Sequence, residues 1–235
     1  MSKSISKQRI NDLISFCKNV DIKFKNIELL DLAFHHRSIT NEIKNHQNNE
    51  RLEFLGDSVL GMVTAAYLYN NLENPEGDLA KIKSSVVSEK ALAPVALRFG
   101  LDKLLVLGKG EELSGGRTKP AILADCMEAI IGAYYLDSGY KAAEKYVLEF
   151  IIPEINNVLT FGMKDYKTKL QELSQKNFKI CPKYEMVSKK GPDHNQTFEF
   201  VVMIGETKYG PAIGKTKKEA EQNAAKIALD TLDLK

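Results

Sequence analysis

Three carboxylates recur at helical spacing within a mainly apolar stretch, and this stretch constrains the fold more than any other. Glu50, Glu53 and Asp57 occupy positions i, i+3 and i+7 of residues 49–63, so a helix formed there carries all three on one face. Charges on so apolar a helix are costly unless water, a partner or a metal ion compensates them. The stretch therefore predicts a helix that presents a carboxylate stripe to a site.

A second apolar stretch carries a similar pair of acids. Residues 121–131 contain only two charges, Asp125 and Glu128, which stand at i and i+3. Such a pair usually marks a solvated or salt-bridged helix face, but residues 121–136 contain no Lys or Arg that could pair with it. Two apolar helices with carboxylate stripes suggest a shared site for a hard cation that prefers oxygen ligands.

Acids on helices also occur in di-iron carboxylate bundles, but the histidines of this chain do not suit one. Such a bundle requires Glu-x-x-His motifs, and none of the four histidines lies three residues after a glutamate. No Ser/His/Asp arrangement for covalent catalysis is evident either. For Glu50, and for Glu76 outside both stretches, a solvated helix face remains the alternative to a functional role.

Composition excludes several classes of protein. Hydrophobic residues make up 43% and charged residues 27% of the 235 residues, as in an ordinary globular protein. No apolar run reaches the ~18 residues that a membrane span needs, and the first residues have no apolar core like that of a signal peptide. The three cysteines are scattered and odd in number, so we expect reduced thiols, no zinc site and a cytoplasmic protein without a membrane anchor.

Helical patterns fill the first two thirds of the chain, and strands are expected only after residue 180. Breaks rich in Gly, Pro and Ser separate helices predicted at 6–17, 27–34, 51–69, 77–87, 88–99, 120–136 and 139–159. A helix at 166–176 then precedes strands at 183–188, 197–204 and 208–213 and a last helix at 217–232. We expect an all-α domain at residues 1–162 and a compact α+β domain, α-β-β-β-α, at residues 163–235.

Charge is divided unevenly between these two parts. Residues 1–163 carry 19 basic and 21 acidic side chains, whereas residues 164–235 carry 14 and 10. An acidic part with the carboxylate helices and a basic part suit a metal-dependent enzyme joined to a polyanion-binding module. Such differences are also common between unrelated domains, so the division alone decides little.

Two lysines open the last predicted helix, where the helix dipole disfavours cations. Thr216 as N-cap and Glu219 three residues later form a capping-box pattern, which places Lys217 and Lys218 in the first turn. Cations there cost ~0.3–1 kcal/mol each. A bound phosphate would explain the arrangement, because the helix end and both ammonium groups would converge on it. Two solvated surface lysines explain it equally well.

The second part resembles a double-stranded RNA-binding domain. The matching segments are residues 165–173, residues 191–194 with the sequence Gly-Pro-Asp-His, and residues 217–221. The resemblance implies that Gln171 and His194 each meet a minor groove of A-form RNA, over ~16 base pairs in all. Lys217 and Lys218 would contact the phosphates between the two grooves. Many such domains carry a third cation where this chain has Glu221.

The first part resembles the endonuclease domain of bacterial ribonuclease III over nearly all of its length. Residues 49–60 match the family signature, and supporting matches lie at residues 34–38, 76–79, 114–117 and 122–132. The two domains also follow the order found in that family. His35 is a departure, because the family usually has threonine there, but it lies outside the acidic motifs.

The resemblance assigns roles to the acids of the two predicted helices. It implies that Glu53, Asp125 and Glu128 are ligands of Mg²⁺, for which Mn²⁺ can substitute. It also implies that Asp57 and Glu128 lie at the centre of catalysis. Carboxylate-bound Mg²⁺, as one ion or as a pair ~3.5–4 Å apart, activates water and neutralises phosphoryl charge.

Further roles follow from the same resemblance. Glu50 and Glu76 would be auxiliary acids near the metal or the RNA entry path. The family works as a homodimer in which each subunit cuts one strand, and Phe54 is expected to fill a pocket on the partner. A core position within its own chain is the alternative for Phe54.

The activity implied is Mg²⁺-dependent hydrolysis of phosphodiester bonds in duplex RNA, which leaves 5′-phosphate and 3′-hydroxyl ends with short 3′ overhangs. The implied role is the processing of ribosomal RNA precursors and of some messenger and transfer RNA precursors. A non-catalytic double-stranded RNA-binding protein on the same fold is the alternative. That alternative predicts lost acids, whereas all six candidate acids are present.

Overall fold

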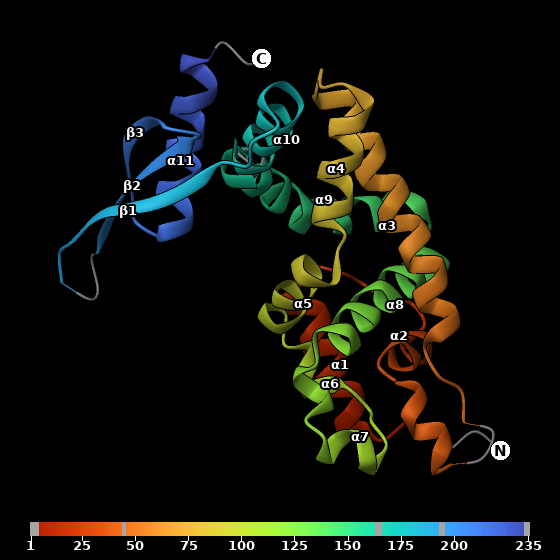
Figure 1. The fold of residues 1–235 in the computed structure, drawn as a ribbon. Helices are drawn as coiled ribbons and strands as arrows, with labels where there is room; N and C mark the ends of the chain where they lie inside the picture. Colours follow the sequence, from red (N-terminus) through yellow and green to blue (C-terminus); the bar gives the residue numbers. More distant parts are fainter. Residues whose placement is uncertain (1–4, 44–45, 163–165, 193–195, 233–235) are drawn as a thin grey trace. The chain divides into compact units, whose positions relative to one another are not determined.

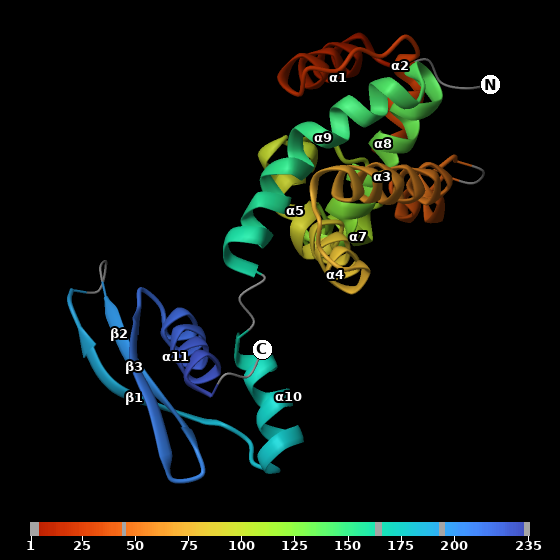
Figure 2. The same cartoon turned by 90° about the horizontal axis from the view of Figure 1, so that it is seen from above.

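A computed structural model describes residues 5–43, 46–162, 166–192 and 196–232 of the chain (Figures 1 and 2). The chain divides into two compact units, Met1–Leu159 and Thr160–Lys235, and each has its own hydrophobic core. The boundary predicted between residues 162 and 163 adjoins residues outside the described ranges and stays a prediction. None of the described helices combines the length and the apolar character that crossing a membrane requires.

The first unit is helical, as predicted. Its described helices are α1 (Lys7–Asn19), α2 (Ile27–Ala33), α3 (Glu50–Asn71), α4 (Glu76–Val86), α5 (Glu89–Arg98), α6 (Leu101–Leu104), α7 (Lys109–Leu113), α8 (Pro120–Ser138) and α9 (Tyr140–Asn157). Short turns are added by η1 (Arg37–Asn41) and η2 (Gly116–Thr118), which are 3₁₀ helices, and by η3 (Val158–Gly162), a π-helical turn. The sequence pattern missed α6 and α7, because four or five residues are too few to show a helical period.

Helix α8 lies at the centre of the first unit (Figure 1). Helices α2, α3, α5 and α9 pack against it. It is apolar around most of its circumference, and Met127 and Ile130 are fully buried, as expected of a helix covered on several sides. Pro120 occupies its first turn, where a missing N–H costs nothing. Asp125 and Glu128 therefore stand on the most enclosed helix of the unit.

Two glycines let α3 and α8 cross at backbone contact. A β-carbon on Gly56 would overlap the backbone carbonyl oxygen of Glu128, and one on Gly132 would overlap that of Leu52. A side chain at either position would force the helices apart. The crossing holds the acidic face of α3 beside the acidic face of α8.

Buried Asn49 fixes the start of α3. Its side-chain Nδ2 donates to the carbonyl oxygen of Ala33 at 3.1 Å, and its backbone N–H donates to the carbonyl oxygen of His35 at 2.9 Å. Both bonds tie the first turn of α3 to the end of α2. That turn carries Glu50 and Glu53. Residues 49–60 therefore contain both these acids and Asn49, the residue that fixes their position.

The second unit confirms the predicted order α-β-β-β-α. Helix α10 (Tyr166–Phe178) precedes an antiparallel sheet of β1 (Lys183–Lys190), β2 (Thr197–Ile204) and β3 (Thr207–Gly214), and α11 (Lys217–Thr231) follows. The strands lie in the order β1-β2-β3. Alternate residues of β2 enter the core with alanines of α11: Phe198, Phe200, Val202, Ile204, Ala220, Ala224, Ala225 and Ala228.

Candidate active site

Glu128 lies at the centre of a group of repelling carboxylates. Partial burial on α8, followed by repulsion from Asp57, Asp125 and Glu53, raises the pKa of Glu128 to about 8. Without a cation, most copies of this side chain are therefore protonated at neutral pH. The charges of α3 and α8 are close enough to oppose one another, as the carboxylate stripes predicted.

Glu53 and Asp125 show the same effect. Partial burial raises the pKa of Glu53, and repulsion from Asp125, Glu50 and Asp57 adds to the increase. Burial also raises the pKa of Asp125. The opposing cation is Arg37, which acts on both acids and forms an ion pair with Glu50 at 3.5 Å. One exposed arginine does not neutralise this much negative charge.

The donor set suits a hard divalent cation. Carboxylate oxygens are preferred ligands of Mg²⁺ and Mn²⁺, and Mg²⁺ retains several waters, so few protein ligands suffice. Within the described ranges, no three His, Cys, Asp or Glu side chains already have the mutual spacing of a metal site. Burial and like charges raise the pKa values of Glu53, Asp125 and Glu128, and a bound divalent ion would favour their ionised forms.

A cavity opens beside Glu53 and Asp125 at the start of α3, and Asp57 and Glu128 are not part of its lining. Its acidic lining consists of Glu50, Glu53, Asp125 and Glu111. Glu111 is compensated within the chain, because its Oε1 lies 2.6 Å from the Nζ of Lys119. Glu50 is paired with Arg37, so Glu53 and Asp125 are the acids of the lining that have no ion pair among the described residues.

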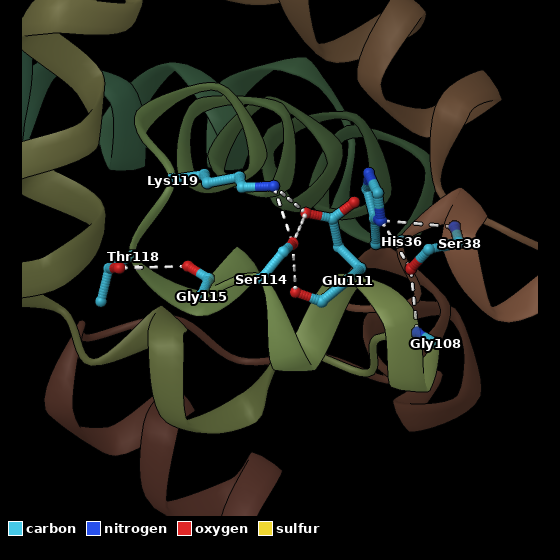
Figure 3. Close-up of polar contacts among 8 residues, drawn as sticks. All are labelled: His36, Ser38, Gly108, Glu111, Ser114, Gly115, Thr118 and Lys119. Carbon is cyan, nitrogen blue, oxygen red and sulfur yellow. Dashed lines mark hydrogen bonds and ion pairs between the residues drawn. The ribbon is translucent and has the colours of Figure 1, made fainter.

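Three basic side chains line the same cavity, namely His36, Arg37 and Lys119. Figure 3 shows Lys119 held between Glu111 and Ser114, whose Oγ is 2.9 Å from its Nζ. The sequence included these side chains in or beside matched segments but gave none a role of its own. Their position at the cavity depends on packing between η1, α7 and the start of α8.

The two auxiliary acids are placed differently. Glu50 lines the cavity and is paired with Arg37. Glu76 is exposed in the first turn of α4 and does not line the cavity. Glu76 is also absent from the charges that shift the pKa values of Glu53, Asp125 and Glu128, so among the described residues the structure does not place it with those acids.

Phe54 is not a core residue of its own chain. Its exposed fraction is 78%, although it follows the partly buried Glu53. It borders a hollow that is also lined by Leu32, Leu55 and Leu136. The alternative of an intramolecular core position is therefore wrong, and the role of Phe54 in a dimer stays a prediction.

The lysines at the start of α11 are exposed, as the pattern indicated. The Thr216 hydroxyl accepts a hydrogen bond from the Glu219 N–H at 3.1 Å, which confirms the predicted N-cap. The Glu219 carboxylate does not return to Thr216; it accepts from the N–H of Lys215 at 2.7 Å. Lys217 and Lys218 thus stand free of that carboxylate beside the positive end of the helix dipole.

Of the remaining predicted RNA contacts, Gln171 lies on α10. Gln171 is exposed on that helix. Glu221, which stands where many similar domains have a cation, is paired with Lys167 at 2.7 Å. Its negative charge is thereby compensated inside the unit. His194 lies outside the described residues.

Comparisons with known proteins agree with both units. The model of the Ribonuclease-III-like family matches residues 26–155, and the model of the double-stranded RNA binding motif matches residues 166–232. Ribonuclease 3 of Treponema denticola is 56% identical over 99% of this chain and 96% of its own length. Ribonuclease 3 of Treponema pallidum is 44% identical over 97% and 92%.

A solved structure supports the assignment of the first unit. The nuclease domain of ribonuclease III from Campylobacter jejuni is 38% identical, with a TM-score of 0.56 over 59% of this chain and 95% of that domain. The residues that match the Ribonuclease-III-like family model, 26–155, contain both α3 and α8. Together with the matches over nearly the full length, these findings show that the chain belongs to the ribonuclease III family.

Proposed function

We propose that this chain cuts both strands of duplex RNA by Mg²⁺-dependent hydrolysis and leaves 5′-phosphate and 3′-hydroxyl ends. Membership of the family makes the chain an endoribonuclease that acts on double-stranded RNA and depends on a divalent metal. The observation that best supports the chemistry is the acid cluster of α3 and α8, in which the pKa of Glu128 rises to about 8.

The proposed metal ligands are Glu53, Asp125 and Glu128. Bound Mg²⁺, with Mn²⁺ as a substitute, would supply an activated water and neutralise charge on the phosphoryl and leaving oxygens. Glu128 and Asp57 have the central role in the reaction, because each contributes charge at the α3–α8 crossing. A water-bearing ion makes a covalent intermediate unnecessary.

Residues around this centre have supporting roles in the proposal. Glu50 lines the cavity and would receive RNA or outer waters of the ion. Glu76, remote from the cavity of its own chain, would act at the entry path of the RNA. The exposed Phe54 would fill a pocket on a second copy, giving a homodimer that cuts the two strands.

The division of labour follows the two units. Residues 1–162 would form the endonuclease domain, and residues 163–235 the domain that binds duplex RNA through Gln171, His194, Lys217 and Lys218. The proposed cellular role is the processing of ribosomal RNA precursors and some messenger and transfer RNA precursors in the cytoplasm.

Incubation with a long RNA duplex tests the proposal. Wild-type protein should release short fragments with 5′-phosphate ends in Mg²⁺ or Mn²⁺, and none in EDTA. The matching single strand should stay intact. Binding of the duplex without cleavage in every divalent ion would instead favour the non-catalytic alternative.

A further inference from the structure

His36 is held in one tautomer by its neighbours. Its Nδ1 accepts a hydrogen bond from the backbone N–H of Ser38 at 3.3 Å and lies 2.9 Å from the Ser38 Oγ (Figure 3). A backbone N–H can only donate, so this nitrogen carries no proton. The Ser38 hydroxyl accepts from the N–H of Gly108 at 2.9 Å, which leaves its own proton for Nδ1. The proton of the neutral ring therefore lies on Nε2.

Burial keeps the ring neutral. Partial burial lowers the pKa of His36, and repulsion from Arg37 acts in the same direction, against attraction to Glu111 and Glu50. At neutral pH the side chain is thus a hydrogen-bond donor through Nε2 alone.

The Nε2–H of His36 has no acceptor among the described residues. Figure 3 shows this nitrogen on the side of the ring away from Ser38. The side chain lines the cavity that also contains Glu53 and Asp125. Buried polar groups are nearly always hydrogen-bonded, and the half-buried ring of His36 leaves its Nε2–H to water or to a bound molecule. A fixed donor left open beside the candidate metal ligands is therefore suited to a bound substrate.

The donors around His36 indicate which kind of group would accept a hydrogen bond from its Nε2–H. Arg37 adds a second donor next to His36: its side chain is 71% exposed and lies 3.5 Å from Glu50, whereas Lys119 is held at 2.6 Å by Glu111. A neutral imidazole and an exposed guanidinium favour an anionic oxygen over a cation or an apolar group. In duplex RNA the anionic oxygens belong to the phosphates, and the sugars add neutral acceptors, among them the 2′-hydroxyl.

We propose that the Nε2–H of His36 binds a phosphate oxygen of the RNA strand in this cavity, so that His36 is a substrate-binding residue and Ser38 positions it. The inference rests on the proposed endonuclease function. It assigns to η1 a contact with substrate in addition to the contacts made by the second unit.

Two substitutions separate the cavity contact from the local fold. In H36N the amide oxygen can still accept from the Ser38 N–H, so the cap of η1 is kept, but no atom reaches the place of Nε2. In H36Q the longer amide can supply an N–H near that place. We expect H36N to melt near wild type and to lower kcat/KM by about tenfold to a hundredfold, the factor for losing a hydrogen bond to a charged group. H36Q should recover part of this loss.

Chemical changes in the RNA identify the contact. Phosphates around the cut are replaced one at a time by uncharged methylphosphonates, and in a parallel set 2′-hydroxyls are replaced by hydrogen. Each duplex is cut by wild type, H36N and H36Q in Mg²⁺. At one phosphate the replacement should slow wild type and H36Q but should not slow H36N further, because its partner is already gone.

Each outcome has one meaning. If every replacement slows H36N by the same factor as wild type, His36 makes no such contact. If only a 2′-deoxy position shows the coupling, the contact is to sugar and the phosphate assignment is wrong. Should H36N unfold, H36Q answers the question, since loss of coupling in a folded H36Q also overturns the proposal. Failure of wild type to cut the unmodified duplex would refute the proposed function itself.

Discussion

Gly56 on α3 touches the backbone carbonyl of Glu128 on α8 with no room for a methyl group between them. The absence of a side chain at Gly56 on α3 therefore helps to set the position of Glu128 on α8. Gly132 makes the reciprocal approach to α3. The active-site cluster thus depends on helix packing as well as on its own carboxylates.

Substituting Gly56 by alanine should destabilise the chain and impair cleavage together. The added methyl forces α3 and α8 apart, and overpacking of this kind typically costs about 1–3 kcal/mol. Gly61 is a matched control on the same helix, because nothing lies within 4 Å of a β-carbon there. G61A should keep or raise the melting temperature, since alanine is the better helix former by about 1 kcal/mol. Equal melting temperatures for G56A and G61A would contradict the close crossing.

The raised pKa of Glu128 makes stability depend on pH. Its ordinary value is 4.5 and its value in the folded chain is about 8, so its contribution is complete below pH 4.5 and is lost as the pH rises to 8. E128Q cannot ionise and escapes this loss. In EDTA we expect E128Q to melt above wild type at pH 8 and close to it at pH 4.5.

Mg²⁺ should reverse the order of the melting temperatures of E128Q and wild type at pH 8. A cation that binds the folded chain stabilises it by about 2.7 kcal/mol at a hundred times its dissociation constant. At pH 8 the melting temperature of wild type should rise with Mg²⁺ more than that of E128Q. An equal rise in the two proteins would show that Glu128 is not a ligand.

Phe54→Ala should weaken assembly without unfolding the chain. The ring is exposed in the single chain, so its removal costs that chain little. Truncation of an aromatic buried in an interface costs ~3–5 kcal/mol. Sedimentation at micromolar protein should show more monomer. Leu113→Ala is the control, since Leu113 is 89% exposed outside the hollow around Phe54. An unchanged dimer in F54A would remove Phe54 from the interface.

Replacing Lys217 and Lys218 by alanine should weaken duplex binding and reduce its salt dependence. Each lost phosphate contact lowers the log–log slope of affinity against salt by roughly one. The measurement is titration of an uncleaved duplex in EDTA at several salt concentrations. K208A, which removes an exposed lysine paired with Glu185 at 3.5 Å, should leave the slope nearly unchanged. Equal slopes for all three proteins would place the phosphate site elsewhere.

The sequence predicted those features of the structure that depend on the periodicity of nearby residues, namely the faces of helices and strands. Spacing along one helix put Glu50, Glu53 and Asp57 on α3, and alternation in residues 197–204 predicted the buried face of β2. Both depend on neighbours within a few positions. The order of the long helices and of the strands was therefore predicted correctly, whereas the short helices α6 and α7 were missed.

Contacts between distant segments could not be read in the same way. The hydrogen bond from Gly108 to Ser38 joins residues 70 positions apart, and no periodicity in the sequence predicts it. The α3–α8 contact also depends on two glycines that look like ordinary helix interruptions in the sequence. His36 became a candidate only when packing placed it beside the acids.

Single-turnover cleavage by E128Q tests the central claim most directly. Wild type and E128Q are bound to the same duplex in EDTA, where their affinities should agree, and cleavage is started with saturating Mg²⁺. We predict that wild type cuts the duplex, whereas E128Q holds it intact, because the amide keeps the shape of the side chain but not its charge. Cleavage by E128Q at a rate near that of wild type would contradict the account.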